Sequence, residues 1–136
     1  MDADDTFVSR ISRRTDVDPN GYFDIVAHGT SNSIQITHNG EHILVDHRVA
    51  AQLIQNADGY NGQPIRLLSC NTGSLDDGFA QNLANTLNVD VMAPTKYVCA
   101  NPDGSYFISG IRRVGNITVS DGNMGEFRVF TPGGNR

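Results

Sequence analysis

Two residues that could carry nucleophilic chemistry each follow a short apolar run of this chain. The first run, residues 22–27, ends at His28 and Gly29, and the second, residues 65–69, ends at Cys70. Apolar runs of this length that stop at a turn are typical of buried strands. Because the carboxyl ends of parallel strands form the crevice in which ligands bind, we expect His28 and Cys70 to meet at one edge of a sheet.

A cysteine at such an edge is a candidate nucleophile. A neighbouring imidazole and the positive end of a helix both lower the pKa of a thiol, from about 8.5 toward roughly 4–7. Gly29 has no side chain, so its backbone amide can approach a substrate carbonyl and, together with the amide of Cys70, hold an oxyanion. The alternative interpretation of Cys70 is a small buried hydrophobic residue. The other cysteine, Cys99, has no helix start nearby and is interpreted as structural.

The elements that must position these residues alternate between strand and helix. The pattern predicts strands at 22–27, 65–69 and 89–94, and a hairpin of 33–37 with 42–45 around the Asn-Gly of its turn. Asp46 can cap one helix. A second helix is predicted to begin at Thr72 or Ser74, with Asp76 and Asp77 at its positive end. This order is typical of a mostly parallel sheet with helices packed on it.

The remaining segments differ in character from this core. A short apolar stretch at 7–11 is predicted as an edge strand within a loosely held segment, residues 1–20. The α/β core spans residues 21–100. Residues 101–136 contain turn-rich sequence between three strand-like runs (106–109, 116–119 and 126–130), which predict a β meander or flap followed by a frayed tail.

Composition places bounds on the function. The chain has 136 residues, 38% of them apolar and 18% charged, with a net charge of −5. These values are typical of one globular domain and argue against nucleic acid as a partner. No apolar run approaches the roughly 20 residues of a spanning helix, so no membrane association is predicted.

Other ligand classes are not indicated either. The chain contains two cysteines, which could pair but are expected to be free thiols. His38, His42 and His47 lack a regular ligand spacing, so no metal site is predicted. No cofactor is expected.

The two strand ends resemble a known family. The sequence YFDIVAHG with IRLLSC is similar to the strand-His-Gly and strand-Ser-Cys pair of the caspase-like (clan CD) cysteine peptidases, which include caspases, gingipains, separase, CHAT domains and the self-cleaving domains of clostridial and RTX toxins. The resemblance covers roughly residues 21–100. It implies a three-layer caspase-like α/β fold and a catalytic dyad of His28 and Cys70, with Gly29 in the oxyanion hole.

The resemblance leaves the substrate open. Asp24, Asn71 and Lys96 are candidates for substrate binding by proximity alone, and Asn71 and Asp24 could also orient the dyad. Only about 20 residues precede the histidine strand, where the family has at least one more strand and helix. A dyad of this kind runs deamidation or transglutamination as well as proteolysis, because all three proceed through a thioester.

A second resemblance concerns delivery. LLSCNTG and FAQNLANTLNVDVMAPT are similar to C-terminal toxin domains of Rhs and YD-repeat polymorphic toxins. It implies an effector delivered as the C-terminal part of a secreted carrier, acting on a protein substrate in the target-cell cytoplasm, with a cognate immunity protein as a possible partner. The self-cleaving relatives use a small-molecule activator near a β flap, and Arg112 and Arg113 could serve such a role here.

Two rival functions remain. His28-Gly29-Thr30 resembles the entry motif of histidine-type mono-ADP-ribosyltransferase toxins, in which Tyr106 and Glu126 could supply the later aromatic residue and acid. A transferase of this kind predicts a less regular alternation of strands and helices in the middle of the chain. It also predicts no catalytic role for Cys70. The other rival is a catalytically inactive caspase-like module that only binds.

Overall fold

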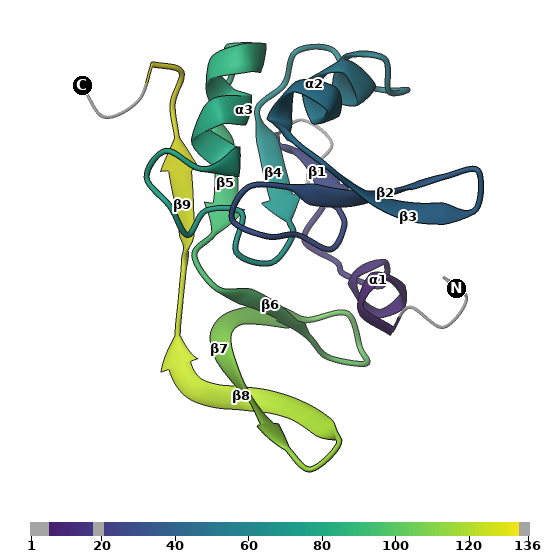
Figure 1. Ribbon diagram of the computed structural model, residues 1–136, viewed down its shortest axis with the longest axis vertical. Helices are drawn as coiled ribbons and strands as arrows, with labels where there is room; N and C mark the ends of the chain where they lie inside the picture. The colour runs from purple at the N-terminus through teal and green to yellow at the C-terminus, as the bar shows by residue number, and fades with distance from the viewer. Residues whose placement is uncertain (1–5, 18–20, 134–136) are drawn as a thin grey trace.

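A four-stranded sheet forms the centre of the molecule (Figure 1). The computed structural model describes residues 6–17 and 21–133. The strand order is β1-β4-β5-β9. The strands are β1 (Phe23–Val26), β4 (Ile65–Leu68), β5 (Val91–Pro94) and β9 (Phe127–Phe130). The first three are parallel to one another and β9 is antiparallel to β5, so the predicted mostly parallel sheet is confirmed.

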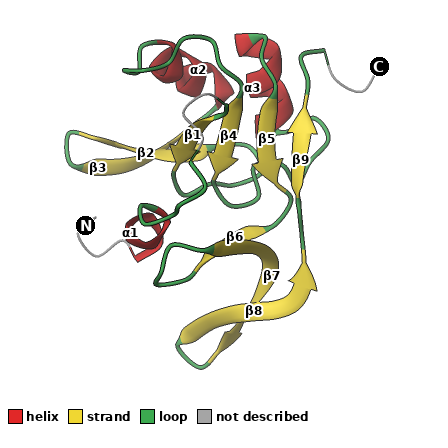
Figure 2. Cartoon of the chain, turned by 180° about the vertical axis from the view of Figure 1, so that it is seen from behind, coloured by secondary structure: helices red, strands yellow, loops and turns green. Residues whose placement is uncertain are grey.

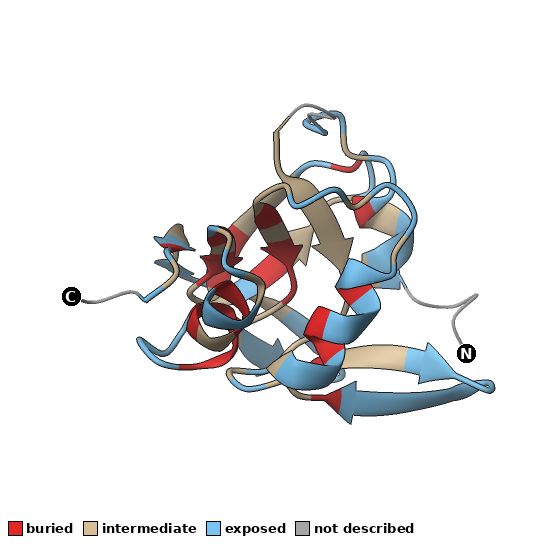
Figure 3. Cartoon of the chain, turned by 90° about the horizontal axis from the view of Figure 1, so that it is seen from above, coloured by how far each residue is buried: buried red, intermediate tan, exposed pale blue. Residues whose placement is uncertain are grey.

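Two helices pack together against this sheet, α2 (His47–Gln55) and α3 (Phe79–Leu87) (Figures 1 and 2). Asp46 caps α2 as predicted, because its Oδ1 accepts hydrogen bonds from the N–H groups of Arg48 at 3.0 Å and Val49 at 3.2 Å. The buried residues lie on the central strands and on the inner sides of these helices (Figure 3). This cluster is the larger of two hydrophobic cores.

A second core lies between the central sheet and a smaller antiparallel sheet. The smaller sheet has the order β6-β7-β8, formed by β6 (Tyr97–Ala100), β7 (Tyr106–Val114) and β8 (Ile117–Met124). The buried residues of this core come from α1 (Thr6–Ile11), β4, β6 and β7, and they are Ile11, Leu68, Val98 and Ile108. The fold is therefore mixed α/β, with a partly parallel sheet and antiparallel strands toward the C-terminus.

The predicted hairpin is confirmed. It pairs β2 (Ile34–His38) with β3 (Glu41–Val45). The two residues of its turn, Asn39 and Gly40, have φ of 52° and 79°. Such a turn matches the twist of the strands it joins and favours asparagine followed by glycine.

The stretch at 7–11 is a helix and not the edge strand that we predicted. Ile11 is fully buried in the second core. The Arg10 guanidinium donates to the carbonyl oxygen of Ala100 at 3.0 Å, which ties α1 to β6. Helix α1 is therefore anchored on the second core through Ile11. Residues 1–5 and 18–20, like the tail residues 134–136, lie outside the described residues.

The helix after Cys70 begins later than predicted. α3 starts at Phe79, and its N-cap, Gly78, makes no side-chain cap hydrogen bond. Asp76 and Asp77 precede the helix and do not lie in its first turn. The predicted cap Thr72 is buried, and its hydroxyl donates instead to the carbonyl oxygen of Ser69 at 2.8 Å. A loop of turns therefore separates Cys70 from the helix.

The C-terminal strands divide between two sheets. Residues 126–130 were predicted as part of the meander, but β9 pairs with β5 in the central sheet. The meander is completed instead by β6, a strand that the sequence did not indicate. The predicted boundary between the α/β core and the meander, at residues 100 and 101, therefore falls where β6 passes into the loop that leads to β7.

Candidate functional site

The register of β1 and β4 sets side by side the strand ends that precede His28 and Cys70. Val26 lies opposite Leu68 in this parallel pair. The N–H of Ala27 donates to the carbonyl oxygen of Leu68 at 3.4 Å, so the pairing continues past the last assigned residue of β1. Continued for two more residues, this register would place His28 beside Cys70. Cys70, like Val26, packs against the core that contains Leu68, and the ring of His28 contacts Phe7, which packs on the same core.

Gly29 holds the two strand ends in close contact. A Cβ atom at this position would lie 2.9 Å from the carbonyl oxygen of Cys70 and 2.9 Å from Cγ2 of Thr72. Only glycine allows the backbone to approach this closely. Gly29 therefore packs directly on the backbone of Cys70.

Helix α1 covers the face on which His28 and Cys70 lie. The ring of Phe7 stands 5.3 Å from the imidazole of His28, centroid to centroid, at an angle of 41°. Phe7 and Cys70 also pack against the same hydrophobic core. The imidazole and the thiol therefore share one largely apolar environment beneath the N-terminal helix.

The environment of Cys70 raises the pKa of its thiol, contrary to our expectation. Burial is the main cause. The N–H of Val98 donates to Sγ at 3.4 Å and offsets only part of this effect. The predicted help from a helix dipole is missing because α3 begins at Phe79. Cys70 is therefore a neutral thiol near pH 7 in this state.

The second cysteine is also a free thiol. Cys99 is half-buried on β6, one residue beyond the Val98 that contacts Cys70. Burial raises the pKa of Cys99, and the neighbouring Cys70 and Asp121 raise it further. It lines a cavity on the smaller sheet, with Tyr97 and Phe107.

Two of the candidate substrate-binding residues lie together. Asn71 follows Cys70 with a left-handed φ of 63°. Its N–H donates to the carbonyl oxygen of Lys96 at 2.9 Å. The ammonium of Lys96 in turn donates to the carbonyl oxygen of Asn123 at 3.1 Å. Asn71 therefore borders Cys70 and the backbone of Lys96 lies beside Asn71, whereas the Lys96 ammonium is directed to the smaller sheet.

The third candidate, Asp24, lies in an ion network. Its carboxylate accepts from Arg66 at 2.6 and 2.8 Å and from Arg14 at 2.9 and 3.1 Å. Its side chain is only 8% exposed. On β1 it is four residues before His28, a separation of about 13 Å in a strand.

The same network includes groups that sequence reasoning missed. Arg66 also donates to Asp16 at 3.0 Å and to the hydroxyl of Tyr106 at 2.9 Å, and that hydroxyl donates to Asp16. Burial tends to raise the pKa of Asp16, but its hydrogen bonds with Arg66 and Tyr106 outweigh this and lower it. Burial and the bond to Asp16 raise the pKa of Tyr106 to about 12. These partners lie up to 90 residues apart in sequence, so no local pattern could reveal them.

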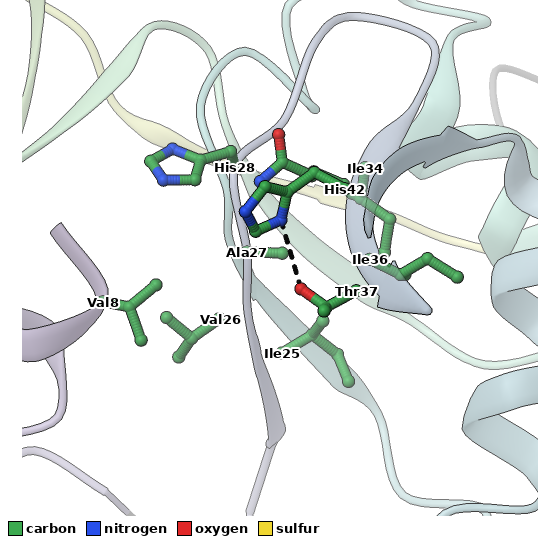
Figure 4. A pocket seen from close by; sticks show the side chains of 10 residues that line it. Val8, Ile25, Val26, Ala27, His28, Ile34, Ile36, Thr37 and His42 are labelled. Atoms are coloured by element: carbon green, nitrogen blue, oxygen red, sulfur yellow. Dashed lines mark hydrogen bonds between the residues drawn. The ribbon is translucent and has the colours of Figure 1, made fainter. Parts of the chain in front are cut away.

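A cavity of about 350 Å³ opens beside His28, between β1, α1 and the hairpin. Figure 4 shows Val8 of α1 and Val26 of β1 facing each other at its side, while Thr37 and His42, paired residues of the hairpin, form a hydrogen bond in its wall. The hydroxyl of Thr37 and Nδ1 of His42 are 3.2 Å apart. Sequence reasoning did not find this cavity, because it arises where the hairpin turns away from β1.

The described residues contain neither a cluster of metal-ligating side chains nor a helix that could span a membrane. Among the residues that the structure describes, no group of three or more His, Cys, Asp or Glu side chains could hold a metal ion. No helix in the described ranges is long and apolar enough to cross a bilayer.

The chain belongs to a family described as a domain of unknown function (DUF8616), whose model matches residues 1–108. The match includes α1, both strand ends and the first strand of the smaller sheet, and it stops within β7. No curated protein and no solved structure matches the chain significantly.

Proposed function

We propose that this protein is a thiol enzyme of the cysteine peptidase type, with His28 and Cys70 as its catalytic dyad. The observation that carries the proposal is the register of β1 and β4, which sets side by side the two strand ends that His28 and Cys70 follow. A histidine and a cysteine follow adjacent carboxyl ends, and Gly29 packs on the cysteine backbone. Ligand sites of parallel sheets lie at these ends, so the arrangement favours a catalytic site over a coincidence.

The raised pKa of Cys70 favours general-base activation over a preformed ion pair. As Cys70 Sγ bonds to the carbonyl carbon of an amide, the imidazole of His28 takes the thiol proton. The amides of Gly29 and Cys70 are the candidate donors to the oxyanion. His28 then gives the proton to the leaving amine as the C–N bond breaks, which leaves a thioester on Cys70.

Water completes the cycle. His28 removes a proton from a water molecule as its oxygen bonds to the thioester carbon. As the C–S bond breaks, His28 gives this proton to the sulfur, which restores the thiol and releases the carboxylic acid, which ionises in solution. The same thioester yields deamidation when the leaving amine is ammonia, and transamidation when an amine replaces water. Peptide hydrolysis is our proposal for this chain, and the three outcomes differ only in their products.

The wider setting is proposed on the resemblance alone. A caspase-like domain delivered as the C-terminal part of an Rhs-type carrier would act on a protein in the target-cell cytoplasm, and a cognate immunity protein would cover the site in the producer. Asn71, which follows Cys70, and Lys96, whose carbonyl oxygen accepts from the Asn71 N–H, are the better placed of the candidate substrate contacts.

The transferase alternative receives no support from the geometry. His28 follows β1, whereas Glu126 immediately precedes β9, at the opposite edge of the central sheet. Three strand spacings separate these edges, about 14 Å. Tyr106 is occupied in the network with Arg66 and Asp16.

Expression in a bacterial cytoplasm tests the proposal. We expect the wild-type chain and Cys99→Ala to arrest growth, and Cys70→Ala and His28→Ala to be tolerated at equal protein levels. Equal toxicity of Cys70→Ala and wild type would contradict the peptidase assignment. A toxic wild type whose effect is lost on Glu126→Ala but not on Cys70→Ala would support the transferase. Harmless wild-type protein with an unreactive Cys70 would support the binding module.

A further inference from the structure

Within the described part of the chain, no strand lies beside the outer edge of β1. β1 is the first strand in the order of the central sheet, and β4 lies on its other side. Among the described residues, a single bridge between Gly29 and Ile34 is the only pairing beyond its outer edge, and it lies past the end of the strand. The hairpin then turns away from β1, and the cavity of about 350 Å³ lies between them, lined by Ile25, Val26 and Ala27 on one side and by Ile34, Ile36 and Thr37 on the other.

The backbone groups on this edge are arranged to bind another strand. The N–H of Phe23 donates to Pro64 at 2.7 Å and the N–H of Ala27 donates to Leu68 at 3.4 Å, so alternate residues of β1 bond to β4. The residues between them, Asp24 and Val26, therefore direct their N–H and C=O groups away from β4. Such a row is a ready template for an added strand.

The walls of the cavity fit apolar side chains. Val8 of α1 and Val26 lie at one side, and Ile36 and Thr37 of β2 lie at the other (Figure 4). The volume is at the lower end of the range for ligand pockets. An extended polypeptide is the ligand class that supplies both features, because it carries N–H and C=O groups at strand spacing and side chains on alternate sides.

We propose that the groove beside β1 binds an extended polypeptide segment of about four residues as an added strand of the central sheet. The Val26 N–H and C=O groups bond to its backbone, and its apolar side chains fill the cavity. His28 lies at the end of this groove. The bound segment therefore approaches the proposed dyad and is part of the substrate, a statement that rests on the proposed function, whereas the binding itself does not.

The probe is a library of blocked octapeptides with valine, leucine, isoleucine or phenylalanine at every second position and threonine or lysine between them. The library is incubated with the Cys70→Ala protein, so that no member is turned over, and retained members are identified by mass spectrometry. Binding of the best member is then measured by fluorescence polarisation. The same peptide with N-methyl groups on alternate residues serves as a control, because methylation removes backbone donors and leaves the side chains.

Two variants locate the binding site. Thr37→Trp places a large ring in the cavity, and the matched control His38→Trp changes the next residue, whose side chain points to the other face of the hairpin. We expect Thr37→Trp to weaken binding by roughly tenfold or more and His38→Trp to leave it unchanged. The N-methylated peptide is expected not to bind.

Hydrogen exchange gives a readout that needs no cavity variant. Bound peptide should slow exchange of the Val26 amide, since this N–H becomes part of a sheet ladder. The proposal is overturned if no library member is retained, if Thr37→Trp and His38→Trp bind equally well, or if the Val26 amide remains unprotected. Failure of the proposed enzyme is seen separately, as a Cys70 thiol that does not react in the peptide-free wild-type protein.

Discussion

Gly29 and Cys70 meet at the ends of two parallel strands, where a Cβ atom on the glycine would lie 2.9 Å from the carbonyl oxygen of the cysteine. The contact joins the loop after β1 to the loop after β4. It makes the relative position of His28 and Cys70 sensitive to a single methyl group.

Gly29→Ala should therefore destabilise the protein and separate the dyad. Overpacking of this kind costs about 1–3 kcal/mol in the free energy of unfolding. Chemical denaturation measures the loss, and Asn32→Ala on the exposed part of the same loop should change stability by less than about 0.5 kcal/mol. Equal stability of Gly29→Ala and wild type would show that the strand ends are not in contact.

The buried carboxylate of Asp24 should contribute strongly to stability. Asp24→Ala leaves Arg14 and Arg66 without this partner. The side chain of each arginine is only 13% exposed. Removing one member of a buried ion pair costs about 3–5 kcal/mol. The control is Arg48→Ala, which removes an exposed pair with Asp46 and should cost no more than about 1 kcal/mol. Similar unfolding midpoints for the two variants would contradict the network.

Removing the hydroxyl of Ser69 should not destabilise the chain. Ser69 is fully buried, and its Oγ has no hydrogen-bond partner among the described residues. An unsatisfied buried hydroxyl costs about 1–3 kcal/mol, so Ser69→Ala should raise the free energy of unfolding or leave it unchanged. Thr72→Val tests the opposite case, because the hydroxyl of Thr72 donates to the backbone carbonyl oxygen of Ser69. Its removal should lower the free energy of unfolding. A clear loss of stability in Ser69→Ala would reveal a partner for this hydroxyl.

The buried thiol of Cys70 should make the fold less stable at alkaline pH. Its pKa is raised in the folded state by burial, so the unfolded chain releases this proton at a lower pH. The contribution to stability is complete below the unfolded thiol pKa of about 8.5 and is lost as pH rises through the folded pKa. Denaturation at pH values from 7 to 10 should therefore show a steeper loss for wild type than for Cys70→Ala. Parallel curves for the two proteins would mean that the thiol is not desolvated.

The elements around the dyad could be predicted from the sequence because their signals are local. The apolar runs ending at His28 and Cys70, the Asn-Gly turn and the Asp46 cap each lie within a few residues of the structure they specify. Phe7, Val8 and Ile11 also fit a helical spacing, but a run this short is compatible with either element, and packing of Ile11 in the second core decides the outcome.

The features that could not be predicted depend on distant parts of the chain. β9 joins β5 across more than 30 residues, and Arg66 collects partners from the N-terminal segment and from β7. The pKa of Cys70 is raised by burial and lowered in part by a hydrogen bond from Val98 of β6, which lies 28 residues away. Hydrophobic periodicity contains no information on such pairings. The sequence therefore predicted a lowered pKa for the Cys70 thiol, whereas burial raises it.

Labelling with a mixture of peptidyl acyloxymethyl ketones, read by intact-protein mass spectrometry, tests the proposed dyad most directly, because a catalytic thiol displaces the acyloxy group to form a stable thioether. Our account predicts one adduct, on Cys70, in the wild type and in Cys99→Ala, and labelling slower by about a hundredfold or more in His28→Ala. Labelling of Cys70 at the same rate with and without His28, or labelling of Cys99 in preference to Cys70, would contradict the dyad.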